Sequence, residues 1–110
     1  MSTFKTDLQT VKSQLTGREK VAFNFRISEE FGAKSIDNLS LSARASNVLH
    51  RNHVETLNDV MDVWTSMNEF KNCGKTTVKD IHVAFVEFYY ASLSEKQRAA
   101  FWKDAIKLSA

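Results

Sequence analysis

The sequence predicts an all-α fold, and three observations support that prediction. The 110 residues include no proline and only three glycines, so few of them would break a helix. Apolar residues recur every three to four positions in several segments, which is the spacing of an amphipathic helix. Serine and threonine stand at the starts of several of these segments, where their side chains can cap a helix.

The N-terminal segment starts with apolar residues at helical spacing over 4–15, and Gly17 is placed to end that helix. Residues 21–27 alternate between apolar and polar, as a half-buried strand does, so a short strand there stays an alternative. Such a strand would need a partner, which a second copy of the protein could supply. Thr16 followed by Glu19 forms a capping-box pattern that favours a helix instead.

Two short helices form the centre of the predicted fold. Residues 32–38 are predicted to be a linker into this part of the chain. Ser42 can cap a helix that runs to about Asn52, and Thr56 can cap the next one, with Asp59 near its positive end. The residues expected to face inward are Ala45, Val48 and Leu49 in the first helix, and Leu57, Val60, Met61 and Trp64 in the second.

A long helix is predicted from about 76 to 93, with apolar residues on two opposite sides. A helix of this kind must be buried on more than one side. The last helix, over 95–107, begins with a capping box formed by Ser94 and Gln97 and is the natural cover, and the N-terminal helix is the other candidate. These expectations divide the chain into an N-terminal flank 1–35, a central domain 36–93 and a C-terminal helix 94–110.

Composition and charge narrow the class of protein. With 43% hydrophobic and 25% charged residues, the chain has the composition of a single globular domain. A net charge of +2 is only mildly basic, whereas a protein that coats DNA nonspecifically needs many cations to neutralise phosphates. The single cysteine, Cys73, excludes an internal disulfide, and the sequence has neither a leader nor a long apolar run. We therefore expect a cytoplasmic protein that does not enter a membrane.

Residues with metal-binding or catalytic chemistry do not form a recognisable set. His50, His53, His82 and Cys73 lack the close spacing of structural zinc ligands. No nucleophile has a base or a paired carboxylate at a spacing that the sequence brings close. We therefore expect no metal, no cofactor and no enzyme activity, and we expect Cys73 to be a buried filler.

One turn has the chemistry of an anion site. Residues 72–77, Asn-Cys-Gly-Lys-Thr-Thr, stand at the start of the long helix, where free backbone amides attract anions and glycine lets a phosphate approach. The Gly-Lys-Thr at 74–76 imitates the end of a nucleotide-binding P-loop, but that motif requires a glycine at the position of Glu69. A plain connection between two helices is the alternative, and the turn taken alone favours it.

The order of residues over half of the chain carries a resemblance to a known family. The motifs are Ile36-Asp-Asn-Leu-Ser-Leu-Ser-Ala-Arg-Ala-Ser-Asn-Val-Leu-His50, Val54-Glu-Thr-Leu-Asn-Asp-Val60, Asn72-Cys-Gly-Lys75 and Val78-Lys-Asp-Ile81. In this order and spacing they resemble the C-terminal domain of the bacterial RNA polymerase alpha subunit. The pattern is specific, because the first motif followed about twenty-five residues later by an Asn-x-Gly-Lys turn is hard to obtain by chance.

The resemblance implies a compact helical fold that contains a helix-hairpin-helix, and it assigns DNA-binding roles to residues of this protein. Arg44 would enter the minor groove, and Asn47 would hold the DNA backbone beside it. The implied target is A·T-rich duplex DNA, whose narrow minor groove attracts an inserted arginine. The other members of the predicted DNA-binding set are Asn72, Gly74, Lys75 and Thr77, and also Thr76 and His50, where the family commonly has basic residues.

The sequence differs from a whole alpha subunit because it lacks that protein's N-terminal assembly domain. We therefore expect a free-standing regulator or accessory protein of a bacterium, a phage or a mobile element. The first hypothesis is a small DNA-binding protein that modulates transcription. One alternative is an interaction module that docks on RNA polymerase, a sigma factor or an activator through its aromatic flanks. Another is a homodimeric scaffold closed by residues 1–35 and 86–110.

Overall fold

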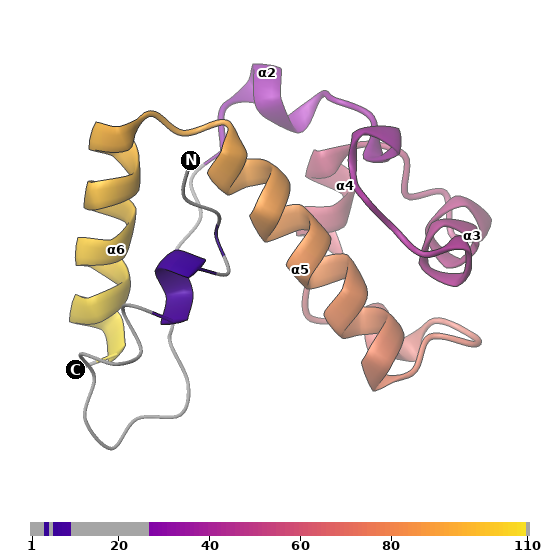
Figure 1. Ribbon diagram of the computed structural model, residues 1–110. Helices are drawn as coiled ribbons and strands as arrows, with labels where there is room; N and C mark the ends of the chain where they lie inside the picture. The colour runs from indigo at the N-terminus through magenta and orange to yellow at the C-terminus, as the bar shows by residue number, and fades with distance from the viewer. Residues whose placement is uncertain (1–3, 5, 10–26, 110) are drawn as a thin grey trace. The chain divides into compact units, whose positions relative to one another are not determined.

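The computed structural model describes residues 4, 6–9 and 27–109, and only the backbone for residues 106–109. The described residues confirm the all-α fold, because they contain helices, turns and one isolated bridge between Ser35 and Thr56 (Figure 1). The alternative of a short strand over 21–27 falls almost wholly outside these residues. The named elements are α2 (Glu29–Gly32), η1 (Ile36–Asn38), α3 (Ala43–Arg51), α4 (Leu57–Asp62), η2 (Met67–Glu69), α5 (Lys75–Ala91) and α6 (Glu95–Ser109).

The protein forms two compact units. One spans Ile27–Phe88, and the other comprises the N-terminal residues together with those from Tyr89 onward. The last turn of α5 and all of α6 therefore belong to the second unit. The division at 35/36 and 93/94 that we expect from the sequence stays a prediction.

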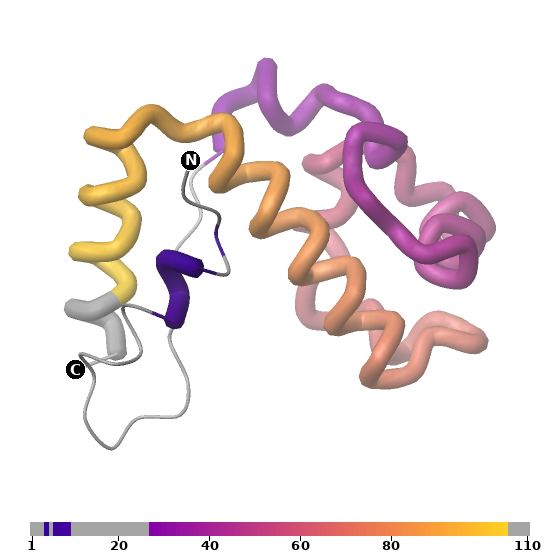
Figure 2. Tube along the Cα trace, in the orientation of Figure 1, coloured from indigo at the N-terminus to yellow at the C-terminus, as the bar shows by residue number. Residues whose placement is uncertain are grey.

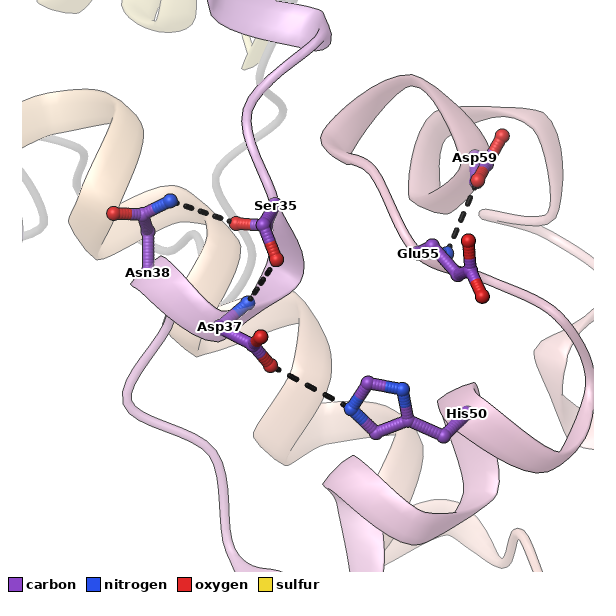
Figure 3. Close-up of polar contacts among 6 residues, drawn as sticks. All are labelled: Ser35, Asp37, Asn38, His50, Glu55 and Asp59. Carbon is purple, nitrogen blue, oxygen red and sulfur yellow. Dashed lines mark hydrogen bonds and ion pairs between the residues drawn. The ribbon is translucent and has the colours of Figure 1, made fainter.

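The segment 32–38, predicted as a linker, is partly helical instead. Ser28 caps α2 by accepting the Phe31 amide at 3.1 Å, and the Ser35 hydroxyl caps η1 in the same way (Figure 3). Gly32 lies so close to α4 that a Cβ there would overlap the Asn58 side chain. Elements of three or four residues are too short for an apolar period to show in the sequence, which explains the error.

The N-termini of α3 and α4 are capped as the sequence predicts. The Ser42 hydroxyl accepts the Ala45 amide at 3.1 Å. Thr56 and Asp59 form a reciprocal capping box, in which the Asp59 carboxylate also accepts the Glu55 amide (Figure 3). These bonds from the Glu55 and Thr56 amides lower the pKa of Asp59 below its ordinary 3.8. Both helix starts are therefore fixed by local sequence.

Helix α3 ends in a Schellman motif, although no glycine is present. The Val54 amide bonds the Leu49 carbonyl at 2.9 Å, and the His53 amide bonds the His50 carbonyl at 3.1 Å. His53 adopts the left-handed conformation that this motif requires, with φ of 59°. Val54 and Leu49 are both buried, as expected for the apolar pair that usually accompanies this motif.

The core of the Ile27–Phe88 unit lies where α3, α4 and α5 face one another. The inward residues predicted for α3 are confirmed, as are Leu57 and Val60 of α4, because all are at most 2% exposed. Met61 and Trp64 are only half-buried, so their predicted burial is wrong. Helix α4 ends at Asp62, and Trp64 therefore lies in the following turn instead of on the helix face.

Trp64 stacks on His82 of α5, with ring centroids 4.0 Å apart and planes 9° from parallel. A hydrogen bond of 3.1 Å joins His82 Nε2 to the Trp64 carbonyl. Burial lowers the pKa of His82 below its ordinary 6.5. This pair ties the turn after α4 to the middle of α5.

Helix α5 has buried residues on more than one side, as its apolar pattern predicts. Ile81 and Phe85 are fully buried, and Val86 and Tyr90 on a different side are 7% and 2% exposed. No helix in the described part of the protein is both long enough and apolar enough to cross a membrane.

The second unit has an aromatic centre. The Tyr90 hydroxyl donates to the Asp7 carboxylate and accepts the Trp102 indole N–H at 2.8 Å. Phe4 stacks on Trp102 with centroids 5.6 Å apart. Residues 4 and 6–9 are helical, which confirms the N-terminal helix there, while its predicted remainder lies outside the described residues. Burial, followed by the bond to Asp7, raises the pKa of Tyr90.

Helix α6 starts with the predicted capping box. The Ser94 hydroxyl accepts the Gln97 amide at 3.2 Å, and the Gln97 side chain accepts the Ser94 amide at 2.8 Å. Phe101 packs edge-on against Tyr90, with centroids 5.9 Å apart. The expectation that α6 covers the end of the long helix is thus confirmed for the last turn of α5.

Candidate nucleic-acid interface

A surface cavity of about 640 Å³ lies in the Ile27–Phe88 unit, between α3 and the loop that leads from η2 into α5. Figure 2 shows the backbone turning through this loop beside α3 before α5 begins. The cavity therefore has two walls of different origin. Its lining residues are Arg44, Asn47, Val48 and Arg51 from α3, and Phe70, Asn72, Cys73 and Gly74 from the loop.

The α3 wall is a stripe of residues on one helix face. Arg44, Asn47, Val48 and Arg51 follow one another at the spacing i, i+3, i+4 and i+7. Val48 is 2% exposed, whereas Asn47 and the two arginines are exposed. Neither arginine forms an ion pair with any carboxylate among the residues that the structure describes. This wall therefore presents two positive charges to a ligand.

The loop wall presents backbone more than charged side chains. A Cβ built at Gly74 would meet no atom within 4 Å, so packing inside the protein does not explain the glycine. The absent side chain instead leaves room for an external group to approach the backbone. Cys73 beside it is 5% exposed, and burial raises the pKa of its thiol, which confirms the predicted buried filler.

The N-terminus of α5 completes the loop wall. The Gly74 carbonyl accepts the Val78 amide at 3.0 Å, so the amides of Lys75, Thr76 and Thr77 have no acceptor within the helix. Free amides and the positive end of a 17-residue helix attract an anion. Lys75 and Thr76 are exposed, but Thr77 is only 7% exposed, which makes its backbone N–H a better candidate contact than its side chain.

Asp80 holds the two walls at a fixed spacing. Its carboxylate, on the second turn of α5, accepts the backbone amide of Ser42 at 3.1 Å. Ser42 is the N-cap of α3, two residues before Arg44. The bond therefore fixes the start of the α3 wall against the helix that begins the loop wall.

His50 is not brought to the cavity. Its Nε2 atom lies 3.5 Å from the Asp37 carboxylate of η1, and both side chains are exposed, at 49% and 76% (Figure 3). A carboxylate at this distance neutralises the imidazole when it is protonated and repels a phosphate. His50 therefore differs from the arginines of α3, which have no such neighbour among the described residues.

The structure thus divides the eight residues predicted to bind DNA. Those that line the cavity are Arg44, Asn47, Asn72 and Gly74. Those that follow in the first turn of α5 are Lys75, Thr76 and Thr77. His50 lies apart, and the DNA-binding roles of all eight stay predictions.

Two lining residues, Arg51 and Phe70, were missed by sequence reasoning. Arg51 could have been found, because it stands seven positions after Arg44 and such residues share a helix face. Phe70 precedes the turn outside any regular helix period, so no comparable signal marks it.

The fold and the cavity define a small helical domain with a cationic surface opposite a helix N-terminus, a class suited to nucleic-acid backbones. Residues 26–87 match the family model for the C-terminal domain of the alpha subunit of bacterial RNA polymerase. The protein belongs to this family. Domains of this family are non-catalytic. Family membership suggests a role in transcription that involves DNA binding and protein interaction. Comparisons with curated proteins and with solved structures found no match.

Proposed function

We propose that the protein binds A·T-rich duplex DNA through the minor groove and the flanking phosphates, and thereby modulates transcription. The observation that carries the proposal is the placement of exposed Arg44 across one cavity from Gly74 and the N-terminus of α5. Family membership supports DNA as the ligand and transcription as the process. A transcriptional role implies a cytoplasmic location in a bacterial cell.

Arg44 is the residue that we assign to the groove. The minor groove of A-tracts is narrow and carries an enhanced negative potential, which attracts an inserted arginine. Arg44 is exposed in the first turn of α3 and is not neutralised by a carboxylate in the described part of the protein. Asn47, one turn later on the same face, is the neighbouring hydrogen-bonding group.

The loop wall is assigned to the phosphates on the other side of the groove. Backbone amides and Lys75 bind phosphate without reading bases, so they fix the position of the protein on the duplex. Asn72, Thr76 and Thr77 belong to the same assignment, and Gly74 provides the close approach. The result is a preference for DNA shape in place of a strict base sequence.

His50 remains a proposed DNA contact, but the nearby Asp37 carboxylate weakens its attraction for a phosphate. A phosphate that binds its ring must compete with the Asp37 carboxylate 3.5 Å away. We therefore place His50 at the edge of the interface, where it contributes less than the α3 arginines.

The alternatives rest on the aromatic flanks. Phe101 and Trp102 are 6% and 9% exposed and pack against Tyr90 within their own unit, so they offer little surface for docking. Binding to RNA polymerase, to a sigma factor or to a second copy of the protein stays a prediction. A pull-down with purified polymerase tests the first two, and light scattering tests the homodimer.

The decisive experiment compares the parent with Arg44→Ala on A·T-rich and G·C-rich duplexes over a salt titration. Loss of a groove arginine should weaken binding to A·T-rich DNA by ~1–3 kcal/mol, or about 5- to 150-fold. Lys34→Ala is the matched control, because Lys34 does not line the cavity and instead lies over Phe88. Equal binding by the parent and Arg44→Ala at every salt concentration would refute the proposal.

A further inference from the structure

Arg51 is the second exposed cation on the α3 wall. It stands seven positions after Arg44, which places the two Cα atoms ~10 Å apart along the helix axis. Both side chains line the same cavity, with Asn47 and Val48 between them. The spacing and the shared cavity make Arg51 part of the same surface as Arg44.

The surroundings of Arg51 leave its charge available. Among the described residues it has no carboxylate partner, whereas the adjacent residue His50 points to Asp37. The eight residues that line the cavity include two guanidinium groups and no carboxylate. A planar guanidinium offers five donors that match a phosphate bidentately. A ligand with repeated negative charges would therefore satisfy both arginines at once.

We propose that Arg51 binds a phosphate of the DNA strand that borders the groove entered by Arg44. This inference rests on the proposed function. The minor groove of B-form DNA is ~6 Å wide, so a residue ~10 Å from the groove arginine lies over the backbone and not over base edges. Duplex DNA carries one charge per ~1.7 Å of its axis, so a phosphate lies near any such position.

Arg51 also changes where the charge of the interface lies. On the loop wall, Lys75 is followed by the uncharged Thr76. On α3, His50 lies beside the Asp37 carboxylate. The α3 wall, in contrast, carries two guanidinium groups on one face. The salt dependence of binding should therefore come mainly from α3.

The test measures the slope of log K against log salt concentration for an A·T-rich duplex, using the parent, Arg51→Ala, Arg51→Lys and Lys34→Ala. Loss of one phosphate contact should reduce the slope by ~0.9, with affinity reduced about tenfold at low salt. Arg51→Lys keeps the charge and should keep the slope. Lys34→Ala removes an equal charge from a residue that does not line the cavity and should leave the slope unchanged.

The outcomes separate this inference from the proposed function. If the parent binds and Arg44→Ala is impaired, but Arg51→Ala keeps the parent slope, Arg51 has no phosphate contact and only this inference fails. If the parent does not bind duplex DNA, the proposed function fails and the inference fails with it. Thermal unfolding of Arg51→Ala and Arg51→Lys, each compared with the parent, shows whether a changed slope reflects lost charge or a lost fold.

Discussion

The two walls of the cavity offer a ligand different kinds of contact. The α3 wall presents the exposed side chains of Arg44, Asn47 and Arg51, whereas the loop wall presents Gly74 and the first amides of α5. Charged side chains give affinity that falls as salt rises. Backbone amides give position and close approach, which depend on shape. DNA binding should therefore be weakened by loss of charge on the α3 wall and by a change of backbone shape on the loop wall.

A second contrast lies in how each wall is built. The α3 wall depends on a helix whose two ends are fixed by Ser42 and by the turn at His53. The loop wall depends on a turn in which Asn72 adopts φ of 61° and Gly74 leads into α5. The hydrogen bond from the Ser42 amide to the Asp80 carboxylate joins the two walls. Outside the α3 arginines, changes to the shape of the turn should affect binding most, and changes away from both walls least.

Gly74→Val tests the shape of the loop wall and should have the largest effect among substitutions outside the α3 arginines. The new side chain would occupy the open space beside the turn and keep a phosphate away from the backbone. We expect DNA binding to weaken by at least about tenfold, or ~1.4 kcal/mol. Thermal unfolding should show a loss of about 1 kcal/mol or less, because no atom lies within 4 Å of the added Cβ and the helix loses only a favourable N-cap residue. Unchanged binding would mean that the ligand does not approach this turn.

Asp80→Ala tests whether the walls must be held together. Loss of the bond to the Ser42 amide should destabilise the fold by ~1 kcal/mol and free the start of α3. We expect binding to fall by about three- to fivefold, measured by fluorescence anisotropy at a temperature where the variant is folded. Asp80→Asn keeps an acceptor oxygen and should recover most of the loss. Parent-like affinity in Asp80→Ala would show that the spacing is set elsewhere.

His53→Gly and Asn72→Gly form a matched pair, because both residues have positive φ. Glycine adopts this conformation without strain, so each change should raise stability, by about 1 kcal/mol for histidine and less for asparagine. His53 does not line the cavity, and its variant should bind DNA like the parent. Asn72→Gly removes a lining side chain and should bind more weakly despite its added stability. A loss of binding in both variants would contradict this distinction.

Between pH 7.5 and 5.5, the pH dependence of stability should report His82. Its pKa is lowered in the fold, so the unfolded protein takes up its proton first as pH falls below about 6.5. Its contribution to stability is therefore present above that pH and is lost progressively below it. Urea unfolding at pH 7.5 and 5.5 should show a loss that is smaller in His82→Gln. An equal loss in both proteins would exclude His82 as its source.

Much of the fold could be predicted because its signals are local. Ser42, Thr56 and Ser94 cap helices within three residues of their own positions, and the apolar period marks the buried face of each longer helix. Short elements carry no such signal, which is why 32–38 was predicted as a linker. The half-burial of Trp64 depends on where α4 ends and on His82, eighteen residues away.

The candidate site was predictable in part, and through resemblance more than through physics. The turn at 72–77 suggested an anion site, but its neighbour across the cavity comes from α3, some thirty residues earlier. Only the ordered motifs of the family resemblance connected the turn with the α3 residues. Arg51 was missed because it lies outside the residues to which the resemblance assigns a role. The Asp37 neighbour of His50 depends on the placement of η1, which the linker prediction could not supply.

The most direct test of a two-walled DNA interface is an NMR titration of the ¹⁵N-labelled protein with an A·T-rich duplex. Both walls should respond together, with shifts of the backbone amides over 43–51 and 72–77 and of the Arg44 and Arg51 side-chain signals. Amides of α6 should stay near their starting positions. Shifts confined to α6, or to one wall alone, would contradict the account.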